Sequence, residues 1–397
     1  MKSMKRVIGL SLALLCLLAL TSCYGLRQIN ELAIVTAVGL DLGEKPDMIR
    51  VSVQIIRPAD ARGQTGAPSG GTGEPIYSVS AEGKTIFEAI RNLGRFTSRR
   101  VYWAHNFVIV MHEDYAKKGI ADMVDFFTRN HELRMNTWVA VTPDRPDEVI
   151  STITGLEVVP GEAVDRLFRD NEVAGQAPGS NMMSLEETFL SRSSQSVLAK
   201  VSLKPRGISN KKPGEHGSIK QVELAGAAVF QNDRMVGWLN PKDARGLLFF
   251  IQHLDSGIEV LSCPNRDAKA TAEFRHARMK VKTIYRNEKL RFDIRLKTDA
   301  DIVESGCDIP ISEIRSDLTK QLEMRLKQGL EDVVDKSQHK YRSDFLKLGD
   351  VFRNEYPMEW HKLAAKWKQV YAEAEVNVTV KADITSTVLK AAGRGVK

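Results

Sequence analysis

The sequence lacks the short motifs that mark most catalytic and cofactor-binding proteins. It contains no HExxH, GxSxG or CxxC motif, no Walker-type glycine-rich loop and no clustered metal-ligand triad. Catalytic groups can converge in space without a motif, so these absences do not exclude every enzyme. They favour a non-enzymatic protein, and we expect no cofactor and no metal site.

Cysteine is scarce, at four residues in a chain of 397. Cys16 lies in an N-terminal apolar run and Cys23 follows that run, which leaves Cys263 and Cys307. These two could form a disulfide outside the cytoplasm, but the sequence does not place their Cα atoms within bonding distance. We therefore expect them to be unpaired, with a disulfide as the alternative.

Long apolar runs are also lacking, with one exception close to the N-terminus. Residues 7–20 form an apolar run of about 14 residues that follows Lys2, Lys5 and Arg6. This layout is typical of a signal peptide, and the run is shorter than the roughly 20 residues that cross a bilayer as a helix. No later stretch approaches that length, so we expect the rest of the chain to lie in water.

The apolar run ends in Leu20-Thr21-Ser22-Cys23, which resembles the lipobox of bacterial lipoproteins. The two small residues give a peptidase access to the backbone, and the Cys23 thiol is the nucleophile that takes up diacylglycerol. Two acyl chains give a stable anchor where one gives marginal binding. We expect residues 1–22 to be removed and Cys23 to be lipidated. The alternative is an ordinary secretory signal followed by a chance cysteine.

The chain has little excess charge of either sign once the signal is removed. The formal net charge of the whole chain is +7, and loss of residues 1–22, with their three cations, lowers it to +4. Lysines and arginines are interleaved with acids and form no single arm or stripe along the sequence. We therefore expect no nucleic-acid partner.

Hydrophobic periodicity predicts strands and helices grouped into three units. Strands are expected over 32–40, 49–56, 101–111 and 135–141, and helices over 84–99, 113–129 and 146–153. A hairpin at 280–296 and a long amphipathic helix over 311–334 mark the last unit. We expect an α+β (mixed α/β) fold of three domains, each a mostly antiparallel or mixed sheet flanked by helices. The expected boundaries are 23–178 for the N-terminal domain, 179–198 for a linker helix, 199–264 for a small middle domain and 265–397 for the C-terminal domain.

Seven residues of the first unit are candidates for an interaction surface or a local structural role: Arg100, Trp103, His105, Asp125, Arg129, Glu132 and Arg134. Strand alternation over 101–111 puts Trp103 and His105 on one face. We therefore expect His105 to be a hydrogen-bonded core histidine, with a titrating contact as the alternative. Asp125 and Arg129 are spaced i,i+4, which favours an ion-paired turn or cap over a partner-binding surface.

Several segments, each weak alone, follow one another in a specific order: 27–41, 99–105, 119–134, 224–230, 236–240 and 344–350. Among them are the strings RRVYWAH at 99–105 and DFLKLGD at 344–350. In this order the chain resembles the Ger(x)C family, the C-subunit lipoproteins of spore nutrient germinant receptors. Tyr24, where the family usually has Trp, and Asn130, where it usually has Asp, depart from the pattern and put local contacts in doubt.

The resemblance implies an architecture of three mixed α/β domains and a location on the outer face of the spore inner membrane. It also implies a Gram-positive spore former as the source and a complex with two multi-spanning membrane subunits, of A and B type. It transfers no catalytic residue, so Cys23 alone carries over as a site.

Together these observations predict a lipid-anchored receptor subunit that is needed for nutrient-triggered spore germination and acts by protein-protein interaction. Two alternatives stay open: a lipid-anchored solute-binding protein that presents a small germinant, and an envelope enzyme such as a murein hydrolase. A two-lobed ligand cleft would favour the first, and a polar pocket with perturbed carboxylates would favour the second.

Overall fold

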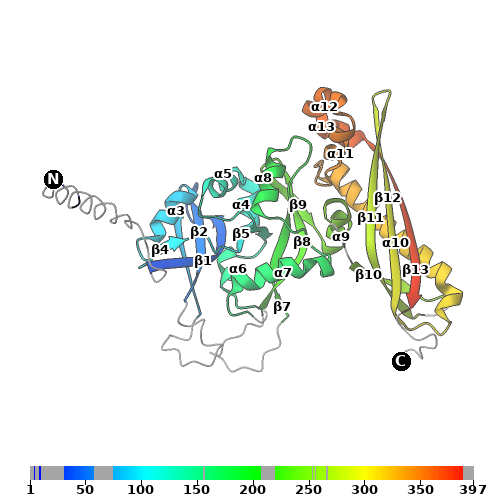
Figure 1. The fold of residues 1–397 in the computed structure, drawn as a ribbon, viewed down its shortest axis with the longest axis horizontal. Helices are drawn as coiled ribbons and strands as arrows, with labels where there is room; N and C mark the ends of the chain where they lie inside the picture. The colour runs from blue at the N-terminus through cyan, green and yellow to red at the C-terminus, as the bar shows by residue number, and fades with distance from the viewer. Residues whose placement is uncertain are drawn as a thin grey trace.

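The structure is a computed structural model that describes residues 31–57, 75–154, 157–206, 220–252, 254, 256–264 and 267–387, together with Met4 and Gly9. The expected lipidation site, Cys23, and most of the expected signal peptide lie outside these residues. The described chain forms two sheets, which lie at opposite ends of the molecule (Figure 1).

The first sheet has nine strands. Their order is β3-β2-β1-β5-β6-β7-β8-β9, and the short β4 pairs with the start of β1. The central strands β1, β5, β6 and β7 are parallel, and antiparallel strands extend the sheet on both sides. The bounds are β1 Leu32–Leu42, β2 Ile49–Ile56, β3 Ile76–Gly83, β4 Arg100–Tyr102, β5 Val108–His112, β6 Trp138–Thr142, β7 Val197–Pro205, β8 Lys220–Gln231 and β9 Arg234–Leu239.

Helices cover both faces of this sheet, because its central strands are apolar on both sides. One face packs against α3 Ile86–Leu93, α4 Glu113–Lys118, α5 Ala121–Arg129 and α8 Met182–Leu190. The other face packs against α6 Pro146–Ser151 and α7 Pro160–Ala174. Each of these helices buries an apolar stripe and leaves its polar side in solvent.

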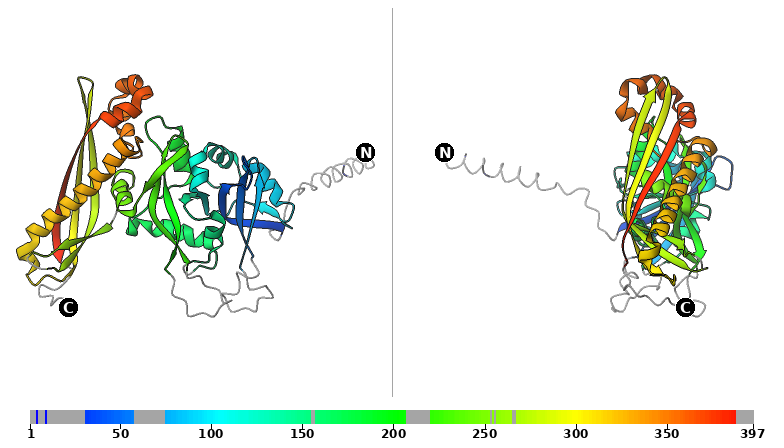
Figure 2. Two further views of the ribbon diagram at one scale, coloured as in Figure 1. Left: turned by 180° about the vertical axis from the view of Figure 1, so that it is seen from behind. Right: turned by 90° about the vertical axis from the view of Figure 1, so that its right-hand side faces the viewer.

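The second sheet has four strands in the order β10-β11-β12-β13, and α10 runs along one of its faces (Figures 1 and 2). Alternation along β12 buries every second residue against α10, so the opposite face of the sheet is open. The remaining bounds are α9 Pro241–Ile251, β10 Ser256–Ser262, β11 Lys269–Arg286, β12 Lys289–Ser305, α10 Ile311–Asp335, η3 Lys336–Lys340, α11 Leu348–Glu355, α12 Pro357–Leu363, η4 Ala364–Lys366, α13 Trp367–Glu373 and β13 Glu375–Thr387.

The expected mixed α/β fold class is confirmed. The expected division at 178, 198 and 264 stays a prediction. Strands from both sides of the expected linker share one sheet, since Ala140 of β6 pairs in parallel with Ala199 of β7.

Two elements that were expected to be continuous are interrupted in the structure. The helix expected over 113–129 is broken into α4 and α5 at Gly119, which has φ +136° and approaches Asp233 of the β8–β9 turn. A side chain at this position would collide with that carboxylate, and the backbone conformation favours glycine. The strand expected over 101–111 is interrupted at residues 103–107, where the Phe107 amide donates to the Thr36 carbonyl (3.0 Å).

The expectation that Cys263 and Cys307 are unpaired is also wrong. They form a disulfide with a Cα–Cα distance of 5.5 Å. Cys263 directly follows β10 and Cys307 lies just after β12, and the antiparallel order of β10, β11 and β12 brings these two strand ends together. The bond therefore fastens the edge strand of the second sheet.

Candidate functional site

A groove of about 600 Å³ lies between α3, α5 and the segment 94–103 that connects α3 to β5. We call it the aromatic groove. Its apolar residues are Phe87, Ile90, Val101, Trp103 and Phe126. It contains five of the seven candidate residues expected from the sequence, namely Arg100, Trp103, Asp125, Arg129 and Glu132.

The sequence of α3 explains why one side of this groove is apolar and open. Thr85 caps the helix by accepting a hydrogen bond from the Glu88 amide (3.1 Å), and Ile86, Ala89 and Leu93 face the core. Phe87 lies on the other side of the helix with 52% of its surface exposed. Its ring centroid is 6.3 Å from that of Phe126 on α5. Phe126 is partly buried against the core, so the exposed ring of Phe87 forms the open apolar side of the groove, which suits a contact surface.

Two ion pairs at the rim involve the expected charged candidates. Asp125 and Arg129 pair along α5 (2.7 Å), as their i,i+4 spacing predicts, and both side chains are largely exposed. Arg100 of β4 pairs with Glu132 (2.7 Å), which joins the strand to the loop after α5. The Asp125–Arg129 pair is exposed, and pairs of that kind contribute about 0.2–1 kcal/mol, so it fixes local geometry more than it stabilises the fold.

The three candidates that form no ion pair in the part of the chain that the structure describes lie at different depths. Trp103 is buried at 5% exposure, and its ring centroid lies 6.5 Å from that of Phe127. His105 is exposed in the loop 103–107, so its expected place in the core is wrong, because the strand that carried the alternation argument stops at Tyr102. Arg134 is exposed beyond the groove and makes no ion pair among the described residues.

Sequence reasoning missed the cations that give the groove its charge. Arg91 lies over the Phe87 ring, with its guanidinium carbon 4.9 Å from the centroid, and Arg99 is exposed on the rim. Neither forms an ion pair within the described part of the chain. The groove therefore has a cationic excess beside an open aromatic face. The amphipathic pattern of α3, in which Phe87 and Arg91 fall opposite the buried residues, could have identified Arg91; Arg99 lies beyond that helix and had no such signal.

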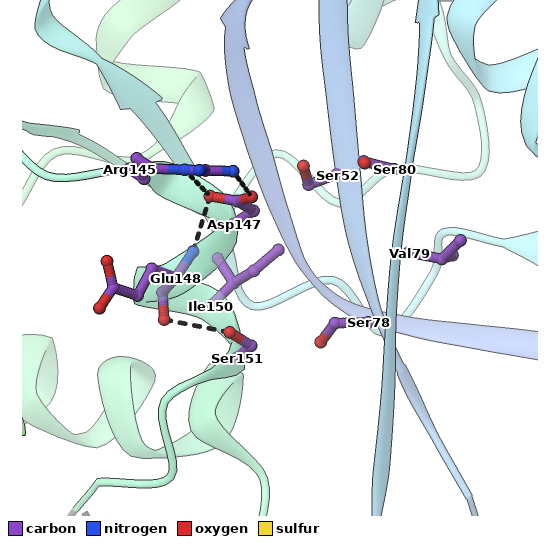
Figure 3. A pocket seen from close by; sticks show the side chains of 9 residues that line it. All are labelled: Ser52, Ser78, Val79, Ser80, Arg145, Asp147, Glu148, Ile150 and Ser151. Atoms are coloured by element: carbon purple, nitrogen blue, oxygen red, sulfur yellow. Dashed lines mark hydrogen bonds and ion pairs between the residues drawn. The ribbon is translucent and has the colours of Figure 1, made fainter.

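A second pocket, of about 390 Å³, lies between β2, β3 and the start of α6 (Figure 3). Serine hydroxyls from Ser52, Ser78 and Ser80 face the helix, where Arg145 pairs with Asp147 (2.6 Å). Burial alone would raise the pKa of Asp147, but the Arg145 hydrogen bond and charge outweigh it and lower the pKa. A carboxylate held ionised is a poor general acid, and the nine lining residues include no histidine or lysine to activate a serine.

A buried carboxylate lies at the junction of the two sheets. Asp344 accepts hydrogen bonds from the amides of Leu348 (3.1 Å) and Gly349 (2.6 Å) and from Nε1 of Trp367 (3.1 Å). Burial raises the pKa of Asp344 to about 7, although these three donors favour the ionised form. Its carbonyl accepts from the amide of Gln195 (2.9 Å), which lies two residues before β7 of the first sheet. Asp344 therefore organises the junction.

The described residues contain no group of three or more His, Cys, Asp and Glu side chains arranged to hold a metal ion. In the same part of the chain, no helix combines the length and hydrophobicity that a membrane span requires.

Comparison with known proteins covers almost the whole chain. The family model described as "Spore germination protein N-terminal domain" matches residues 25–203, and the model "Spore germination B3/ GerAC like, C-terminal" matches residues 225–388. Spore germination protein KC of Bacillus subtilis (strain 168) is 24% identical, and the match covers 94% of this chain and 93% of that protein. Spore germination protein B3 of the same organism is also 24% identical, with 94% and 96% covered.

A solved structure shares the fold. The crystal structure of the GerBC protein matches with a TM-score of 0.53 at 19% identity, and the match covers 90% of this chain and 99% of that one. The two family models, the full-length relatives and the common fold agree, and the chain belongs to the Ger(x)C family of spore germination proteins.

Proposed function

We propose that this chain is a lipid-anchored subunit of a spore germinant receptor that supports nutrient-triggered germination through protein contacts and not through catalysis. The observation that carries the proposal is its likeness to named germination proteins over 94% of its length. The lipobox-like residues before Cys23 support anchoring on the outer face of the spore inner membrane. In the serine-lined pocket Arg145 holds Asp147 ionised, so Asp147 does not supply the general acid that a murein hydrolase needs.

The aromatic groove is the proposed docking surface for the two multi-spanning receptor subunits, of A and B type. Leu32 at the start of β1 pairs with Arg100 at the groove, and Leu32 lies nine positions after Cys23 in the sequence. A chain spans at most about 3.3–3.6 Å per residue, so a lipid on Cys23 keeps the groove within about 30 Å of the membrane. An outward-facing membrane-protein segment with acidic and apolar side chains complements Arg91, Arg99 and Phe87.

Co-purification from cross-linked spore membranes tests this docking. The wild-type chain is expected to recover the two multi-spanning subunits, identified by mass spectrometry. The double variant Arg91→Gln, Arg99→Gln should recover at least tenfold less. The matched variant Lys362→Gln, Lys366→Gln removes two exposed cations from the other end of the molecule and should recover as much as wild type. Equal recovery by both variants would exclude the groove, and absence of the subunits from the wild-type sample would contradict the receptor assignment.

The anchor is tested separately by Cys23→Ala. This variant should leave the membrane fraction, and mass spectrometry of the wild-type N-terminus should find a diacylglyceryl cysteine. A variant that remains membrane-bound with its precursor processed normally would show that the lipoprotein interpretation is wrong.

A further inference from the structure

The open face of the four-stranded sheet carries five cations in two adjacent rows. Pairing of β11 with β12 and of β12 with β13 places Arg278, Lys297 and Lys381 directly opposite one another. One step along the strands, Lys280 lies opposite Arg295. All five side chains are exposed on the face away from α10. We call these five residues the cationic band.

This arrangement is unfavourable in the free chain. Residues directly opposite on neighbouring strands have Cβ atoms about 4.5–5.5 Å apart, and like charges in such positions repel. None of the five forms an ion pair within the described residues. Elsewhere on the same face opposite charges do meet, as in the pairs Arg275–Asp301 (3.7 Å) and Arg291–Asp293 (3.1 Å). The sheet therefore pairs its charges on either side of the band and leaves the band itself without counter-charge.

The size of the band indicates the kind of ligand. Three strands span about 10 Å and two alternate residues along a strand span about 7 Å, so the positive area is small. The adjoining rows are mixed in charge: Arg275 lies opposite Asp299, which lies opposite Asp383, on one side, and Lys282 lies opposite Asp293 on the other. A uniformly negative plane such as a membrane surface would also meet these acids. A short anionic segment that covers only the two cationic rows avoids them.

We propose that the cationic band binds an extended acidic segment of a partner protein, with carboxylates at alternate positions. In an extended peptide, side chains two residues apart are about 6.6–7 Å apart and point to the same side. That spacing equals the separation of the two cationic rows, so successive carboxylates of the pattern Glu-x-Glu lie over successive rows. The proposal concerns a surface at the far end of the molecule from the aromatic groove and does not depend on the proposed function (Figure 1).

The test uses the full chain in a neutral detergent and a fluorescent octapeptide in which one Glu-Thr-Glu unit is flanked by Thr, so that its two carboxylates cover only the two cationic rows. Fluorescence anisotropy is expected to detect binding that weakens as salt rises. The triple variant Lys280→Gln, Lys297→Gln, Lys381→Gln should bind at least tenfold more weakly. The matched triple variant Lys362→Gln, Lys366→Gln, Lys368→Gln removes the same charge from exposed positions near α12 and α13 and should bind within twofold of wild type. The band variant should melt no lower than wild type, because the repulsion is relieved, so lost binding is separable from lost folding.

Three outcomes would overturn the proposal. Equal weakening by both triple variants would mean that net charge alone attracts the peptide. Equal binding of the same peptide with Gln in place of both Glu residues would mean that carboxylates are not recognised. Band-dependent binding to phosphatidylglycerol vesicles or to a DNA duplex, without binding to the acidic peptide, would assign the surface to a lipid or a nucleic acid instead.

Discussion

The aromatic groove and the cationic band both contain several arginines or lysines, and they differ in which groups lie next to these cations. In the groove, Arg129 pairs with Asp125 on the same helix and Arg100 pairs with nearby Glu132, while Arg91 lies over an aromatic ring. In the band, strand register holds five cations together with no acid among them. The groove therefore combines local structural pairs with an open apolar face, whereas the band is electrostatic throughout. The groove suits an amphipathic partner and the band suits an anionic one.

The largest expected effect is on the free energy of unfolding, and it distinguishes a buried residue of the groove from an exposed residue in the same loop. Trp103→Ala should lower the free energy of unfolding of the first sheet by about 3–5 kcal/mol, because it removes a buried ring that packs against Phe127. His105→Ala, in the same loop but exposed, should change it by less than about 0.5 kcal/mol. Urea denaturation measures both. A similar cost at the two positions would contradict the burial assigned to Trp103.

The disulfide gives the next largest effect, on the region that carries the band. The paired variant Cys263→Ser, Cys307→Ser opens a loop whose ends are 44 residues apart, and loop-closure entropy predicts a loss of about 2–4 kcal/mol. Hydrogen exchange should show faster amide exchange in β10 to β12 and unchanged exchange in β1 and β5. Reduction of the wild-type chain should reproduce this pattern. Uniform destabilisation of both sheets would contradict a local role.

The junction between the two regions should respond to pH. The folded chain keeps a proton on Asp344 up to about pH 7, whereas the unfolded chain releases it near the ordinary carboxyl pKa of 3.8. The contribution to stability is therefore complete below about pH 4 and is lost as pH rises, by about 2 kcal/mol between pH 5 and pH 7. Urea midpoints measured across this range should fall with pH in wild type and stay flatter in Asp344→Asn. The control variant Asp317→Asn, at an exposed position of α10, should follow wild type.

The smallest effects should have opposite signs in the two regions. Lys297→Gln relieves repulsion from Arg278 and Lys381 and should raise the free energy of unfolding by roughly 0.2–1 kcal/mol. Arg129→Gln removes one partner of an exposed helical ion pair and should lower it by about 0.3–0.5 kcal/mol. Thermal melts at low salt resolve the signs, and added salt should shrink both differences. If both variants changed stability in the same direction, the contrast between unpaired cations in the band and paired charges in the groove would be wrong.

Periodicity predicted the elements whose contacts are local. The amphipathic pattern over 311–334 matches α10, Ile311–Asp335, because leucines at steps of three or four residues define a buried stripe. The hairpin expected at 280–296 lies within β11 and β12. The Asp125–Arg129 pair followed from its i,i+4 spacing in the same way.

Features that depend on distant segments could not be predicted. The break at Gly119 depends on Asp233 in the β8–β9 turn, and the loop after Tyr102 depends on a hydrogen bond to Thr36. The disulfide depends on strand order, and the row of cations needs Lys381 to meet Lys297 from 84 residues away in a parallel pairing. Sequence alone gives residue types and local spacing, whereas register between distant strands is set by the assembled core.

Germination tests the central claim, that the chain is an anchored receptor subunit, most directly. Spores that lack the gene would be exposed to a panel of amino acids, sugars and nucleosides, with wild-type and Cys23→Ala complements in parallel. The account predicts loss of response to particular nutrients with other responses intact, rescue by the wild-type gene and no rescue by the unlipidated form. Normal germination of the deletion strain on every nutrient, or full rescue by Cys23→Ala, would contradict it.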